Sequence, residues 1–115
     1  MNYATAHQLI EQQAQAAAPE DLLARLAQGQ APVPGQVTSI LLALKVIYEA
    51  LHGQASLDRQ TVSLLHRLAG ESRTLFEQGL RQGVDWPPLL DADLGRIAAA
   101  VQGIFTDAWP DIHQV

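Results

Sequence analysis

The chain of 115 residues contains no cysteine and no long hydrophobic run. Without cysteine it can form no disulfide, no thiolate nucleophile and no cysteine-ligated zinc or iron–sulfur centre. Its longest uncharged apolar stretch, Ile40–Leu44, is far too short to cross a bilayer. The first residues also lack the basic and apolar segments of a signal peptide. We therefore expect a cytoplasmic protein without a membrane span.

Basic residues are scarce as well. Lys and Arg total 7 against 12 Asp and Glu, which gives a net charge of −5 at pH 7. This is the wrong sign for a protein that must gather the phosphates of a nucleic acid, so nucleic acid is not expected as a partner. The magnitude is ordinary for a small domain, and it points to no other partner.

Alanine and leucine dominate the composition, and β-branched residues are few. Because apolar positions recur with a helical period, the sequence predicts a single all-α domain, a four- to five-helix bundle over residues 1–115. The expected helices cover about residues 3–17, 19–29, 37–51, 57–80 and 91–108, and residues 1–18 are expected to be looser because their apolar face is thin. We expect Pro19 to begin the second helix, Ser56 to cap the fourth, and Asp85 or Asp91 to cap the last.

The predicted helix at residues 37–51 is apolar around almost its whole circumference. Besides a core-facing side, it carries Leu42, Val46 and Ala50 on the remaining surface. Such a helix must be surrounded, either at the centre of its own bundle or partly by a second subunit. Leu42, Val46 and Ala50 are therefore candidate residues of a homodimer interface.

A second candidate surface lies on the back of the last predicted helix. Gly95, Ala99 and Gly103 recur every four residues, and a row of small residues lets another helix approach closely. Ordinary packing inside the bundle is the more common use of such a row. A subunit interface is the alternative.

Two connectors, residues 30–36 and 84–91, are marked by prolines. The second places Trp86 beside Pro87 and Pro88, and the first contains Pro32 and Pro34. A rigid, aromatic segment can anchor a recognition surface because it loses little entropy on binding. The more conservative interpretation is that Trp86 covers one end of the bundle while the prolines fix the turns.

Residue types that carry chemistry form no recognised pattern. The four histidines share no metal-ligand spacing, and helix capping accounts for the only close acids, Asp85, Asp91 and Asp93. The only lysine, Lys45, stands in a helix with Glu49 as its expected ion-pair partner, and no Walker loop is present. The sequence therefore assigns no catalytic residue, no metal ligand and no cofactor.

The segments Pro32–Lys45 and Gly83–Leu90 resemble a family of short, uncharacterised, all-helical cyanobacterial proteins. The resemblance covers most of the chain beyond the first predicted helix. Some members carry the label dethiobiotin synthetase, which implies an ATP-dependent enzyme on a P-loop α/β fold. The missing Walker loop, the single lysine and the absence of predicted strands contradict that label. The resemblance assigns no site residues.

Three functions remain open. The favoured one is a non-enzymatic interaction or assembly module that forms a homodimer and can bind a further protein partner. The alternative is a small-molecule-binding bundle, with an apolar pocket between helices that Trp86 or Tyr48 closes. The third, an enzyme of the dethiobiotin synthetase type, is disfavoured because no P-loop is present.

Overall fold

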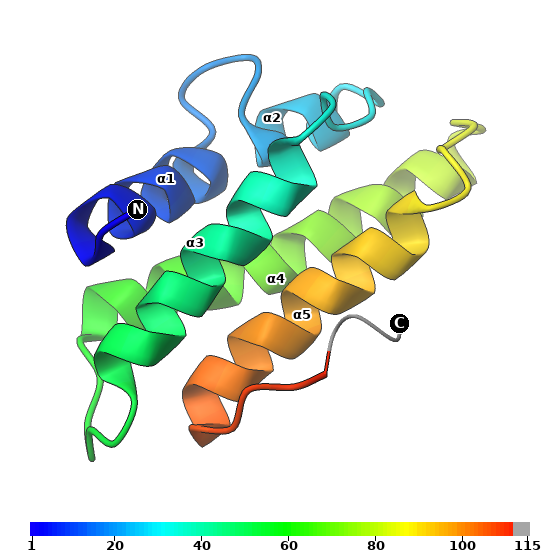
Figure 1. Ribbon diagram of the computed structural model, residues 1–115. Coiled ribbons are helices and arrows are strands. Elements are labelled where there is room, and N and C mark those ends of the chain that lie inside the picture. The colour runs from blue at the N-terminus through cyan, green and yellow to red at the C-terminus, as the bar shows by residue number, and fades with distance from the viewer. Residues whose placement is uncertain (112–115) are drawn as a thin grey trace.

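Residues 1–111, the part of the chain that the structure describes, form five helices and no strand in the computed structural model (Figure 1). The helices are α1 (Tyr3–Gln15), α2 (Leu22–Ala27), α3 (Gln36–Leu51), α4 (Arg59–Arg81) and α5 (Leu90–Thr106). Each helix that the sequence predicts has its counterpart. The prediction of an all-α bundle is confirmed.

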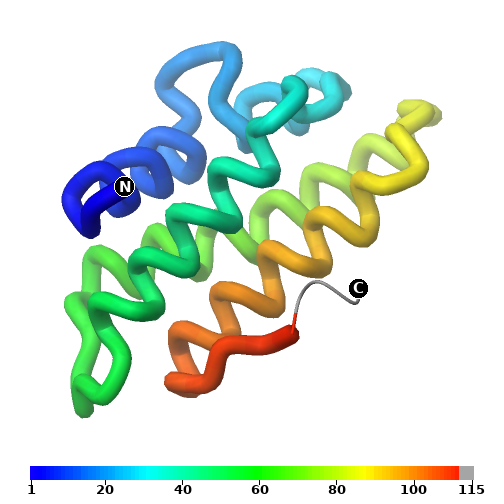
Figure 2. The backbone as a smooth tube through the Cα atoms, viewed as in Figure 1, coloured from blue at the N-terminus to red at the C-terminus, as the bar shows by residue number. Residues whose placement is uncertain are grey.

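Four of the helices pack as a ring. α1 contacts α3 and α4, and α5 contacts the same two helices, so the order around the ring is α1, α3, α5, α4. The short α2 packs on α4 and on α1. α3 and α5 lie side by side and run in the same direction (Figure 2). The connectors that precede these two helices therefore meet at the same end of the bundle.

The core lies inside this ring and is almost entirely aliphatic. α1 contributes Ala6, Ile10 and Ala14, which are buried against its neighbours although its apolar face is thin. A fully buried Leu or Ile stabilises the fold by about 1.5–3 kcal/mol relative to an exposed one. The largest apolar side chains that are fully buried in the other helices are Leu22, Leu26, Ile40, Leu44, Ile47, Leu65, Leu68, Leu90, Leu94 and Ile97. Within residues 1–111 no helix is long and apolar enough to span a membrane.

Two helices begin a few residues later than the sequence predicts. α4 is capped by Asp58, whose carboxylate accepts the Thr61 backbone N–H at 3.0 Å, so the expectation that Ser56 is the cap is wrong. α2 follows Asp21 rather than beginning at Pro19, which lies in the preceding turn. Asp21 makes no side-chain hydrogen bond to α2; its carboxylate accepts the Ala18 N–H at 2.9 Å in the preceding turn.

The start of α5 also differs from the prediction. Neither Asp85 nor Asp91 caps it: Leu89 occupies the cap position, without a side-chain hydrogen bond to the helix. Asp91 stands in the first turn, and its carboxylate accepts a hydrogen bond from the Arg73 guanidinium of α4. Asp91 therefore joins two neighbouring helices, at a place where negative charge is favoured by the helix dipole.

Candidate functional site

A surface cavity of about 650 Å³ lies between the N-terminal halves of α3 and α5. Residues 31–35 form one wall, and Pro87 and Leu89 at the start of α5 contribute to another. α3 supplies Val37, Leu41 and Leu42. The two proline-marked connectors, which are far apart in the sequence, therefore meet at one largely apolar cavity.

Gln36 holds the wall at residues 31–35 in place. Its side chain is buried, and its Oε1 accepts the Val33 N–H at 3.0 Å. Its Nε2 donates to Gln13 Oε1 and to the Glu20 carbonyl, both at 2.9 Å. Every polar atom of the amide thus has a partner, as buried polar groups require. Gln36 connects α1, the turn before α2 and the cavity wall.

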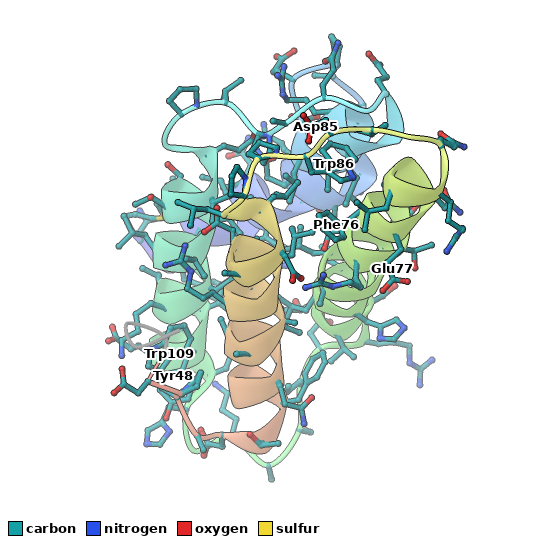
Figure 3. All side chains as sticks on the ribbon, turned by 90° about the vertical axis from the view of Figure 1, so that its right-hand side faces the viewer. Tyr48, Phe76, Glu77, Asp85, Trp86 and Trp109 are labelled. Atoms are coloured by element: carbon teal, nitrogen blue, oxygen red, sulfur yellow. The ribbon has the colours of Figure 1, made fainter. Side chains whose placement is uncertain are left out.

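Trp109 closes the far end of the cavity, where the chain folds back after α5. Figure 3 shows its ring against that of Tyr48 on α3, and the ring centroids are 5.3 Å apart. The Lys45 ammonium lies 4.8 Å from the centroid of Trp109, a distance typical of a cation–π contact. The sequence predicts that Trp86 or Tyr48 closes the pocket. Neither residue lines the cavity. Trp109 is the aromatic residue at its end, and Tyr48 contacts the Trp109 ring from α3.

The segment that carries Trp109 is tethered at Asp107. The carboxylate of Asp107 accepts a hydrogen bond from His52 Nδ1 at 2.6 Å and another from the Gly53 N–H at 3.0 Å. The hydrogen bond from His52, more than the one from Gly53, holds the pKa of Asp107 below its ordinary value of 3.8. His52 and Gly53 follow α3, so this tether joins the C-terminal ends of α3 and α5.

The cavity carries more positive than negative charge, in contrast to the whole chain. Lys45 and Arg96 both line it, and Asp93 is the acidic residue in the lining. Arg96 forms an ion pair with Asp93 on the same helix, and its Nε is buried without a hydrogen-bond partner. Lys45 lies 3.9 Å from Glu49, which confirms the predicted pair, and both side chains are well exposed.

The candidate interface residues of α3 and its neighbours divide into two groups. Leu42 and Pro87 line the cavity, and Leu42 is 57% exposed. Ala50 and Pro88 are exposed outside the cavity lining, and Val46 is half-buried. Within residues 1–111 α3 is not surrounded on every side, because Leu42 and Ala50 are exposed while Val46 packs against the core.

Trp86 lies away from the cavity, in the core. It is 8% exposed, stacks on Phe76 and donates its Nε1–H to the Phe76 carbonyl at 2.9 Å (Figure 3). The ring also packs against Gly79 of α4, where an added Cβ would lie 2.5 Å from its nearest atom. This is the arrangement expected if Trp86 covers one end of the bundle.

The small residues of α5 do not form one open row. A Cβ on Gly103 would lie 2.7 Å from Pro110, so the chain's own C-terminal segment already occupies that position. Gly95 has open space around it, and Ala99 is half-buried. Close packing of a backbone segment, rather than of a second helix, thus accounts for the glycine at 103.

Sequence reasoning missed the lining roles of Arg96 and Trp109. Nothing in the local pattern around either residue indicates a site, because the cavity exists only once α3 and α5 lie in parallel. The net positive charge of the lining is equally invisible in a chain of net charge −5. Among residues 1–111, no group of three or more His, Asp or Glu side chains is placed to hold a metal ion.

Comparisons with protein-family models, curated proteins and solved structures give no significant match. The fold and the cavity therefore define a class only: a small helical bundle with an apolar cavity at its surface.

Proposed function

We propose that this protein is a non-enzymatic binding module and that the cavity between α3 and α5 binds a small, largely apolar molecule. The observation that carries this proposal is the convergence of both proline connectors on one apolar cavity. The volume of about 650 Å³ is within the usual range of small-molecule sites.

The walls of the cavity are suited to binding because they are stiff. Prolines restrict the backbone at Pro32, Pro34 and Pro87, and the Gln36 amide fixes the first wall to α1. A wall that is already ordered loses little entropy when a ligand enters. Burial of Leu42 and Leu89, which are 57% and 71% exposed, would add a hydrophobic contribution to the binding free energy.

Self-association is the second candidate, and one observation favours it. The same Leu42 is 57% exposed within residues 1–111, and a second copy of the chain would bury it. This homodimer would be an interaction module in its own right. The two candidates make different predictions about mass and about ligand binding.

The first experiment measures binding of N-phenyl-1-naphthylamine, an uncharged apolar dye, by its fluorescence. We expect saturable binding of one dye per chain. Thr38→Phe places a ring in the cavity from an exposed lining position and is expected to weaken binding about tenfold or more. Thr74→Phe is the matched control, because Thr74 is an exposed helical threonine outside the cavity. No dye binding, or equal binding by both variants, would refute the proposal.

The second experiment determines the mass by light scattering. For a binding module with a free cavity we expect a monomer whose mass is unchanged in Leu42→Gln. A dimer that dissociates in Leu42→Gln and persists in Leu80→Gln would favour self-association instead. Leu80 is a suitable control because it is 53% exposed on α4, close to the value for Leu42, and does not line the cavity.

A further inference from the structure

We propose that the molecule in the cavity is an amphiphile with a carboxylate head, and that Lys45 and Arg96 hold that head while the alkyl tail lies along α3 toward the proline connectors. This inference rests on the proposed function and names the class of ligand. It follows from the positions of charge and apolar surface within the cavity.

Both cations line the cavity from inside their helices rather than from the proline connectors. Lys45 is nine residues into α3 and Arg96 six residues into α5, about 14 Å and 9 Å from the helix starts at a rise of 1.5 Å per residue. The starts lie at the same end of the bundle, because the connectors before both helices line the cavity. Both positive charges therefore lie beyond the connectors, and Lys45 lies at the end closed by Trp109.

The opposite end of the cavity is apolar. Val33, Pro34 and Leu89 line it there, and α3 contributes Val37 and Leu41 between that end and Lys45. Val37 and Lys45 are eight residues apart, which is about 12 Å along the helix and close to the length of an extended medium-chain alkyl group. A ligand that fits both ends needs an anionic head and a single apolar tail.

Both cations have hydrogen-bonding capacity left for such a head. The Arg96 guanidinium uses one terminal nitrogen for Asp93, and because its side chain is 30% exposed, terminal N–H groups remain for a ligand. The Lys45 ammonium has a single acidic neighbour at 3.9 Å among its described ion pairs, and it otherwise lies over the Trp109 ring. A carboxylate accepts hydrogen bonds from both groups, and such charge-assisted bonds are stronger than neutral ones.

Charge complementarity also favours an anion over a neutral or cationic ligand. Of the charged side chains that line the cavity, two are positive and one is negative, while the chain as a whole carries −5. The N-terminal ends of α3 and α5 add partial positive charge at the other end of the cavity. The side chains that line the cavity thus carry a net charge opposite in sign to that of the whole chain.

The test is calorimetric titration with decanoate below its micelle concentration and with decanol below its solubility limit. These two probes share the tail and differ in the charge of the head. We expect decanoate to bind the wild-type chain about tenfold more tightly than decanol. It should displace N-phenyl-1-naphthylamine, and octanoate should bind more weakly by about two- to fourfold per CH₂ removed.

Substitutions test which side chains bind the carboxylate of decanoate. Lys45→Gln is expected to remove most of the preference for decanoate, and Lys45→Arg to keep it. Arg67→Gln is the matched control: Arg67 pairs with Glu71 on α4 as Lys45 pairs with Glu49, but it lies outside the cavity. Asp93→Asn removes the competing carboxylate from Arg96 and is expected to tighten decanoate binding several-fold.

The outcomes separate this inference from the proposed function. If the dye binds but decanoate and decanol bind equally, or if Lys45→Gln and Arg67→Gln have the same effect, the carboxylate assignment is wrong and the apolar cavity stands. If neither the dye nor either decyl compound binds, both proposals are refuted.

Discussion

The contact between Trp86 and Gly79 allows a sharp prediction about stability. An alanine methyl at position 79 would lie 2.5 Å from Trp86 Cζ2 and 2.8 Å from Cε2 and Nε1. Carbon atoms in contact prefer about 3.5–4.0 Å, so the ring must move by about 1 Å or more. The indole is not free to do so, because it donates to the Phe76 carbonyl at 2.9 Å and stacks on the Phe76 ring.

The expected cost of Gly79→Ala combines three contributions. Overpacking costs about 1–3 kcal/mol, and loss of the indole hydrogen bond costs about 1 kcal/mol. The higher helix propensity of alanine offsets about 1 kcal/mol of this. We therefore expect a loss of about 1–3 kcal/mol in the free energy of unfolding, measured by urea denaturation followed by circular dichroism.

Gly70→Ala is the matched control on the same helix. Nothing lies within 4 Å of a Cβ at this exposed position, so only the propensity gain applies, and a stabilisation of about 0.5–1 kcal/mol is expected. The double variant Gly79→Ala with Trp86→Leu should cost less than the sum of the single changes, because the clash is gone. If Gly79→Ala stabilises the protein as Gly70→Ala does, Trp86 does not pack on α4 as described.

Two further predictions concern the elements that hold the cavity. Gln36→Leu removes the acceptor of the Val33 N–H and the donor to α1, and we expect a loss of about 2–4 kcal/mol in urea denaturation; an unchanged midpoint would show that this network is not needed. Because His52 lowers the pKa of Asp107, the tether's contribution to stability is fully present above pH 3.8 and is lost as the pH falls through the lower, folded-state pKa. Trp109 fluorescence, taken as the difference from Trp109→Phe, should therefore change below pH 3.8. Asp107→Asn should show the altered fluorescence at neutral pH and no such step, and a step that survives in this variant would assign it to another group.

The sequence predicted which segments form helices better than it predicted the residues at which each helix begins and ends. α3 lies within one residue of its expected range, because a long apolar period and a terminal Gly53, which has a positive φ of 83°, define it. The start of α4 was wrong by about two residues, because Ser56 and Asp58 are both good caps and local sequence does not choose between them.

The candidate site was only partly predictable. Stiffness and composition mark the two connectors in the sequence, and Leu42 stands out as an apolar residue on a side of the helix that need not face the core. The addition of Lys45, Arg96 and Trp109 depends on α3 and α5 lying in parallel, a long-range arrangement that no local pattern contains. For the same reason the sequence placed Trp86 among the candidate interface residues, whereas it packs in the core.

The central claim is that ligands bind between α3 and α5, and amide NMR spectra of the isotopically labelled protein test it most directly. On titration with N-phenyl-1-naphthylamine, we expect the largest shift changes at Val37, Leu41, Leu42 and Leu89, which line the cavity. Amides near Phe76 and Gly79, at the buried Trp86, should change little. Shift changes centred on another surface, or none at saturating dye, would contradict the assignment of this cavity as the binding site.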